Sequence, residues 1–176
     1  MDAFEDLVAF LFRNQGYWVE QSFKVRLEKS EKIIIGRPSS PRWEIDLLVY
    51  KAKSNELLVV ECKSFLYSTG VSYSSFGEGV KPDRYKLFND SKLREVVFGH
   101  LVKQLEMQNA ILPHAHIQLC LVAGHIKSGD KARLEKLFSE RGWLLFGEEW
   151  LVKGLQDLGK ESYQNNVASM AAKLLR

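Results

Sequence analysis

Three charged residues within two apolar segments have the types and spacing to do chemistry together. Asp46 lies in WEIDLLVYK (43–51), and Glu61 and Lys63 lie in LLVVECKSF (57–65). Side chains alternate along a strand, so Glu61 and Lys63 point to the same side. Carboxylate oxygens suit Mg²⁺, and an ammonium beside them could orient or help deprotonate a water, or offset charge on a phosphate. These residues therefore predict metal-assisted hydrolysis of a phosphodiester.

The two segments are expected to be neighbouring strands, because residues 53–55 (KSN) between them have the composition of a tight turn. Such a hairpin would bring Asp46 close to Glu61 and Lys63. An exposed ion pair, worth about 0–1 kcal/mol, would explain Glu61 and Lys63 alone. It explains less well why the other apolar strand carries Asp46, because a buried, unpaired acid is costly.

The rest of the chain predicts further helices and strands. Helices are expected over 2–15, 91–112, 130–142, 147–159 and 163–176, and strands over 17–27, 116–124 and 143–146. Residues 28–41 are expected to form a hairpin region around IIIG, and residues 67–90 a long irregular loop. This order predicts an α/β fold whose mixed central sheet contains an antiparallel meander, flanked by helices and followed by C-terminal helices.

The composition is that of a soluble globular protein, with 45% hydrophobic and 27% charged residues. The 176 residues suit one domain, with a core over 1–125 and a C-terminal strand and helices over 126–176. A formal net charge of +3 is compatible with a polyanionic partner but is no evidence for one. Cys62 and Cys120 both lie in apolar runs, which indicates a reducing compartment rather than a disulfide framework. With no signal peptide and no membrane-spanning run, we expect a cytoplasmic protein.

The spacing of Asp46, fourteen further residues and then Glu61-Cys62-Lys63 resembles the motif of the PD-(D/E)XK nuclease superfamily, which has the restriction-endonuclease-like fold. That family places Asp on one strand and Glu-x-Lys on the next. Its core is a helix, a three-stranded antiparallel meander, a helix and a further strand, which the expected elements resemble from residue 2 to about 124. Ile45 stands where the family name has Pro. The resemblance is nearest to the Mrr-like and Holliday-junction-resolvase-like branches.

The resemblance implies a Mg²⁺-dependent DNA endonuclease, in which Mn²⁺ would substitute for Mg²⁺. It implies that Asp46, Glu61 and the backbone carbonyl of Cys62 hold the metal, and that Lys63 assists the attacking water. A non-catalytic DNA-binding or assembly subunit that kept the fold is the alternative, and an RNA-directed nuclease is a third possibility. The intact set of Asp46, Glu61 and Lys63 favours the enzyme.

Members of these branches often carry an acid in the first helix, and FEDLVAFLFRNQGYWVE (4–20) resembles that segment. Helical geometry places Glu5 at the edge of the apolar stripe and Asp6 on the far side, beside Arg13. The family role of metal or water ligand is therefore assigned to Glu5. Favourable interaction of an acid with the helix dipole is an alternative explanation of Glu5.

A polar ladder of His100, Gln104 and Gln108 falls on the apolar face of the helix expected over 91–112. The apolar residues of that face are Leu93, Val96, Val97, Leu101, Met107 and Ile111. Inward polar groups need partners. Several family branches have a Gln on this helix, so the resemblance implies that Gln104 lines the site, although Gln108 stands where a Tyr is expected. Amides bonded to the backbone are the alternative.

Basic residues of the loop over 67–90, namely Lys81, Arg84 and Lys86, could contact the substrate. They lie near aromatic residues, and cations reach phosphates while rings stack on unpaired bases. A solvated loop is the alternative. The expected partner is DNA. The apolar stripe of the last helix is expected to belong to the core, and a homodimer contact there is conceivable.

Overall fold

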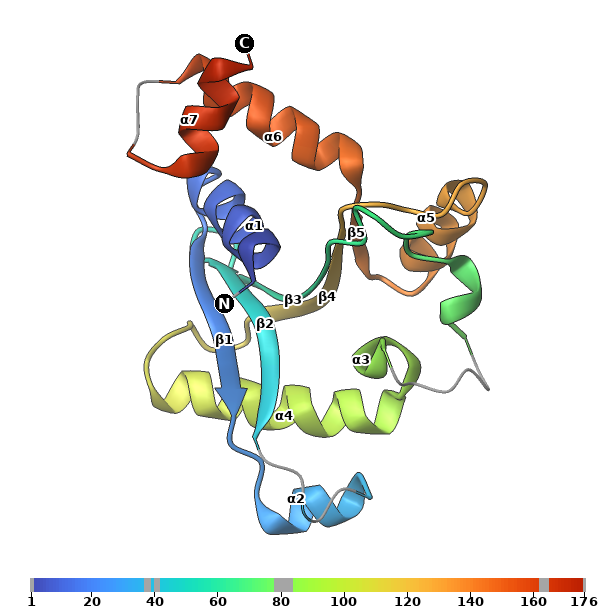
Figure 1. Cartoon of the computed structure of the whole chain (residues 1–176). Coiled ribbons are helices and arrows are strands. Elements are labelled where there is room, and N and C mark those ends of the chain that lie inside the picture. Colours follow the sequence, from blue (N-terminus) through green and yellow to red (C-terminus); the bar gives the residue numbers. More distant parts are fainter. Residues whose placement is uncertain (1, 37–38, 40–41, 78–83, 162–164, 176) are drawn as a thin grey trace.

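A five-stranded sheet lies at the centre of the computed structural model, which describes residues 2–36, 39, 42–77, 84–161 and 165–175 (Figure 1). The strands stand in the order β1-β2-β3-β4-β5. They are β1 (Trp18–Val25), β2 (Trp43–Lys51), β3 (Glu56–Lys63), β4 (His116–Ala123) and β5 (Leu144–Phe146). The first three strands form an antiparallel meander, and β4 and β5 continue the sheet in parallel with β3. The expected α/β class with a mixed sheet is confirmed.

Helices cover both faces of this sheet (Figure 1). One face is covered by α1 (Ala3–Asn14), α6 (Glu148–Lys160) and α7 (Val167–Leu174), and the other by α3 (Lys86–Asn89), α4 (Ser91–Met107) and α5 (Lys131–Glu140). Two short helices lie outside these layers, α2 (Lys29–Ile34) and the 3₁₀ turn η1 (Tyr73–Ser75). None of the helices in the described part of the chain has the length and apolar character needed to cross a bilayer.

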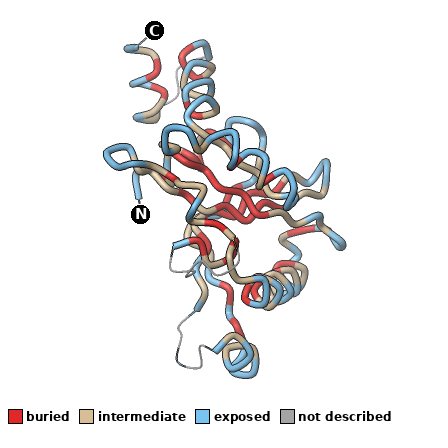
Figure 2. The backbone as a smooth tube through the Cα atoms, turned by 90° about the vertical axis from the view of Figure 1, so that its right-hand side faces the viewer, coloured by how far each residue is buried: buried red, intermediate tan, exposed pale blue. Residues whose placement is uncertain are grey.

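Strand β3 is apolar from Leu57 to Val60 because both of its faces are covered there. Leu57 and Val59 belong to the core beneath α4, whereas Leu58 and Val60 belong to the core beneath α1. Figure 2 shows this buried centre between the more exposed helices. The run of branched residues is therefore what a doubly covered strand requires.

Residues 28–41 do not form the expected hairpin region, because α2 occupies Lys29–Ile34. Glu28 begins this helix with a capping box in which its backbone N–H donates to Glu31 Oε2 at 2.7 Å. No residue of α2 is buried, and Figure 1 shows the helix beyond the end of the β1–β2 pair. Local capping, rather than packing, specifies this helix.

Two further expectations about helices are wrong. The helix expected over 91–112 ends at Met107, and Asn109 then takes a left-handed conformation with φ of 54°. Met107 was expected on the buried face but is 85% exposed. In α7 the stripe expected to be core is largely exposed, at Val167, Met170, Leu174 and Leu175. Ser169 and Ala172 are the residues of α7 that are buried.

Candidate functional site

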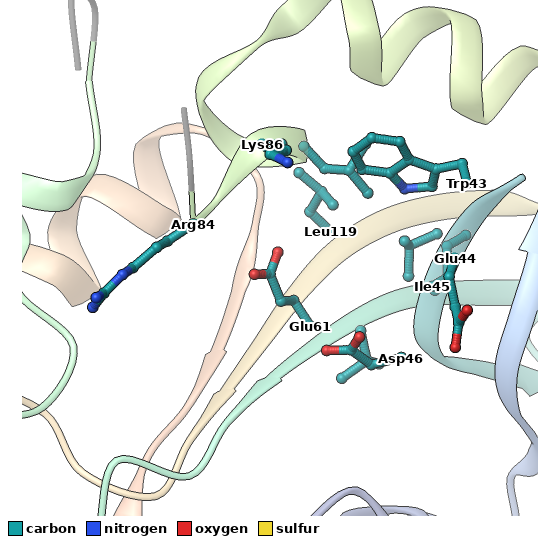
Figure 3. A pocket seen from close by; sticks show the side chains of 11 residues that line it. Trp43, Glu44, Ile45, Asp46, Glu61, Arg84, Lys86 and Leu119 are labelled. Atoms are coloured by element: carbon teal, nitrogen blue, oxygen red, sulfur yellow. The ribbon is translucent and has the colours of Figure 1, made fainter. Parts of the chain in front are cut away.

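Asp46 and Glu61 project from β2 and β3 into one hollow, near the start of β2 and the end of β3 (Figure 3). The hollow has a volume of about 280 Å³. Its lining includes Trp43, Glu44, Ile45, Asp46, Val59, Glu61, Arg84, Lys86 and Leu119. Three carboxylates, of Glu44, Asp46 and Glu61, thus line the hollow together with two basic residues from the segment before α4.

The position of Asp46 depends on where the β2–β3 ladder stops. Backbone pairing runs from Lys51 opposite Glu56 to Leu47 opposite Val60. One residue beyond, Asp46 Oδ2 accepts a hydrogen bond of 2.8 Å from the backbone N–H of Cys62. The side chain therefore takes the place of a backbone acceptor, which fixes the carboxylate between the two strands.

An irregularity in β1 lies opposite this point. Gln21 pairs with Leu47 and Phe23 with Ile45, and Ser22 between them has a left-handed φ of 51°. Alternation should put Ile45 and Leu47 in the same core, yet Ile45 belongs to the core beneath α4 and Leu47 to the core beneath α1. Both strands therefore change faces where Asp46 leaves the sheet, and local kinks of this kind often re-aim a side chain.

Glu61, which lines the hollow, forms an ion pair with Lys63, whose Nζ lies 2.8 Å from Glu61 Oε1. The ammonium also donates to the carbonyl of Cys62 at 3.2 Å. The two side chains are only 24% and 19% exposed, for Lys63 and Glu61 respectively. The pair is therefore too shielded to be an ordinary surface ion pair, and solvent screens it less.

Burial raises the pKa of Glu61, and the charge and hydrogen bond of Lys63 only partly oppose this rise. For Lys63, burial is the largest single influence and lowers the pKa. The charge and hydrogen bond of Glu61, together with the charge of Asp46, outweigh it and raise the pKa overall. Lys63 is therefore a firmly protonated ammonium at neutral pH.

Glu5 of α1 is close enough to this cluster to interact with it electrostatically. Burial, followed by the negative charge of Asp46, raises the pKa of Glu5, and Lys63 opposes the rise. Its neighbour Asp6 is exposed and accepts a hydrogen bond of 2.7 Å from Gln21 Nε2. The geometric choice of Glu5 over Asp6 thus agrees with where the two side chains lie.

Of the three basic residues expected to contact a substrate, Arg84 and Lys86 line the hollow, and Lys81 lies outside the described residues. In Figure 3 Lys86 lies across the hollow from Glu61, whereas the side chain of Arg84 extends away from it. Tyr85 between them is buried, and burial together with the charge of Glu61 raises its pKa to about 12. Its neutral ring anchors the segment that carries the two cations.

Gln104 does not line this hollow. Its Oε1 accepts from the backbone N–H of Arg26 at 3.0 Å, and its Nε2 donates to the carbonyl of Lys24 at 3.3 Å. The amide therefore completes the backbone bonding at the end of β1. His100 contacts Glu31 of α2 at 2.8 Å and is also remote from the hollow.

The thiol of Cys62 lies in the core on the other face, and burial raises its pKa. Only its backbone faces Asp46 and Lys63. Trp43 and Glu44, which also line the hollow, were not among the expected site residues. Side chains alternate along a strand, so Glu44, two residues before Asp46, was expected on the same face as Asp46. This spacing could have indicated Glu44 as a lining residue.

Comparisons of the chain with protein-family models, with curated proteins and with solved structures found no match. The site is therefore interpreted from its own geometry.

Proposed function

We propose that the chain is a metal-dependent DNA endonuclease with a restriction-endonuclease-like fold, which hydrolyses phosphodiester bonds at the hollow of Asp46 and Glu61. The observation that carries the proposal is the convergence of these carboxylates with Lys63 where β2 begins and β3 ends. The element order also supports it, since α1, the β1–β3 meander, α4 and β4 follow in the sequence that the resemblance implies. Lys86, which faces the hollow, supplies positive charge for a phosphate.

The donor atoms fit a hard divalent cation such as Mg²⁺. In the described part of the chain no three His, Cys, Asp or Glu side chains are grouped to hold a metal. The set proposed here is instead two carboxylates, of Asp46 and Glu61, with the carbonyl of Cys62. Lys63 Nζ already bridges Glu61 and that carbonyl, at 2.8 and 3.2 Å, so a positive charge is accommodated there. Asp46 Oδ1 has no hydrogen-bond partner among the described residues, and all these donors are oxygens.

Mg²⁺ bound by these residues would polarise the scissile phosphate and stabilise its developing negative charge. Lys63 holds its proton, because Glu61 raises its pKa. It therefore orients the attacking water or offsets phosphate charge and does not act as a base. Glu5 interacts electrostatically with Asp46 and Lys63, and we assign to it the role of metal or water ligand that the resemblance implies. Lys86 faces the hollow and would hold a phosphate oxygen in place.

Cleavage of supercoiled plasmid, and of linear, branched and single-stranded DNA, in the presence of Mg²⁺ or Mn²⁺ tests the proposal. Asp46→Asn and Glu61→Gln should each abolish cleavage. Glu44→Gln is the matched control, because Glu44 lies two residues from Asp46 on the same strand and also lines the hollow. Mn²⁺ binding, followed by electron paramagnetic resonance, should be lost in the same two variants. If the wild type binds DNA but cleaves no substrate with either metal, the chain is a non-catalytic subunit.

A further inference from the structure

A second groove lies at the outer edge of the sheet, between β1, the start of β2 and α4. It has a volume of about 370 Å³ and is lined by residues that include Glu20, Phe23, Lys24, Arg26, Arg42 and Gln104. Three cations face one acid among its lining residues, which gives the groove a net charge of +2. The proposed cleavage site does not use these residues.

The guanidinium groups of Arg26 and Arg42 are available to a ligand. Both side chains are exposed, and neither has an ion pair or a side-chain hydrogen bond with any described residue. Lys24 is less available, because Glu44 stands opposite it on β2. Guanidinium groups bind phosphate through paired N–H donors. Two of them in one groove therefore favour a phosphodiester backbone, which presents several phosphates in a row, over a single small anion.

The backbone beneath Arg26 is held in a fixed position. Gln104 accepts from the N–H of Arg26 and donates to the carbonyl of Lys24, which ties the end of β1 to α4. Binding at this place therefore requires little ordering of the main chain.

The groove and the proposed cleavage site are lined by consecutive residues at the start of β2. Arg42 directly precedes β2, and Trp43 and Glu44, which follow it, line the hollow of Asp46. Four residues of extended strand from Arg42 to Asp46 span about 13 Å. A DNA duplex rises about 3.4 Å along its axis for each nucleotide of one DNA strand. Arg42 would therefore meet a phosphate roughly four nucleotides from the bond at Asp46.

We propose that this groove, defined by Arg26 and Arg42, binds the phosphodiester backbone of DNA beyond the cleaved bond. The spacing to the cleaved bond rests on the proposed nuclease function, whereas the binding itself rests on the charge and exposure of the groove. Binding therefore requires no divalent metal. It contributes affinity without base specificity, because the guanidinium groups meet only the backbone.

Fluorescence anisotropy with a labelled duplex of about 20 base pairs, in EDTA, tests the binding across a range of salt concentrations. The double variant Arg26→Gln/Arg42→Gln is compared with Lys136→Gln/Lys153→Gln. The control lysines are 78% and 75% exposed on α5 and α6. Each pair of changes lowers the formal net charge from +3 to +1. The groove variant should bind roughly tenfold more weakly, and its salt slope should fall by about two, whereas the control should match the wild type.

Equal weakening by both double variants would show that only net charge matters and would overturn the proposal. No binding of the duplex by the wild type would overturn it too. If a polyglutamate peptide bound the wild type as tightly as the duplex, through the same two arginines, the groove would be assigned to an acidic protein partner instead. Groove-dependent binding without cleavage in Mg²⁺ would support the groove while refuting the nuclease function. Circular dichroism confirms that each variant is folded.

Discussion

The Asp46 carboxylate accepts a hydrogen bond of 2.8 Å from the backbone N–H of Cys62, at the point where the β2–β3 ladder ends. The same side chain thus terminates a sheet ladder and enters the hollow. Cys62 is buried, at 8% exposed, so its N–H needs this acceptor. The structural and the proposed catalytic roles of Asp46 can be separated by substitution.

Asp46→Asn keeps a carbonyl oxygen for Cys62, whereas Asp46→Ala leaves its N–H without an acceptor. Both changes remove the negative charge, so their comparison isolates the hydrogen bond. We expect Asp46→Ala to be less stable than Asp46→Asn by about 1–3 kcal/mol in urea unfolding. Cleavage should fall at least about 100-fold in both, because both lose a metal ligand. Equal stability of the two variants would mean that the hydrogen bond contributes nothing.

The shielded pair of Glu61 and Lys63 should show energetic coupling. Glu61→Gln and Lys63→Met each leave one charge partly buried without its partner, and the double variant leaves neither. A double-mutant cycle of unfolding free energies should therefore give a coupling of about 1–2 kcal/mol, with the double variant more stable than the sum of the singles. A coupling below about 0.5 kcal/mol would make it equivalent to an exposed pair.

Lys63→Met should also change the titration of Glu61. Lys63 lowers the pKa of Glu61 against the effect of burial, so its removal should raise that pKa further. Carboxyl ¹³C chemical shifts measured across a pH series in EDTA report this directly. The matched variant Lys86→Met removes a more weakly acting cation of the same hollow and should shift the pKa of Glu61 less.

Glu5 predicts a pH dependence of stability with a definite sign. Its folded pKa lies above the ordinary value of 4.5, because burial and Asp46 disfavour the charged form. The contribution of Glu5 to the free energy of unfolding is therefore complete below the ordinary pKa and is lost as the pH rises through the folded pKa. Glu5→Gln should match the wild type in melting temperature below about pH 4 and exceed it at pH 7. Equal melting temperatures of Glu5→Gln and the wild type at pH 7 in metal-free buffer would contradict this prediction.

The strands β2 and β3 were predictable because their hydrophobic residues dictate them. Segment 43–51 was expected as a strand and forms β2 over the same residues, since burial on two faces requires the apolar run from Leu47 to Tyr50. The turn at 53–55 then leaves little freedom in register, so Asp46 arrives beside Glu61 and Lys63. The closeness of these three residues follows from patterning alone.

Other features depend on interactions that no local pattern carries. The helix α2 has no buried residue, and Ile33 and Ile34 are 59% and 50% exposed, so hydrophobic period gives no sign of it. The left-handed Ser22 opposite Asp46 is likewise a property of two paired strands. Helical spacing correctly placed His100 and Gln104 on one face of α4. At Gln104 this face meets the end of β1, where the amide bonds to the backbone of Lys24 and Arg26.

The hydrogen bonds of Gln104 therefore predict a structural role, whereas the resemblance implied a role in the catalytic site. Gln104→Ala removes two hydrogen bonds to the backbone near the end of β1 and should lower the unfolding free energy by about 1–2 kcal/mol. The rate of cleavage at saturating DNA should stay within about twofold of the wild type, because the amide does not line the hollow of Asp46 and Glu61. Gln108→Ala is the matched control on the next turn, and it should preserve both stability and rate. Single-turnover cleavage by Gln104→Ala that is slowed as severely as by Glu61→Gln, with the fold intact, would return Gln104 to the catalytic site.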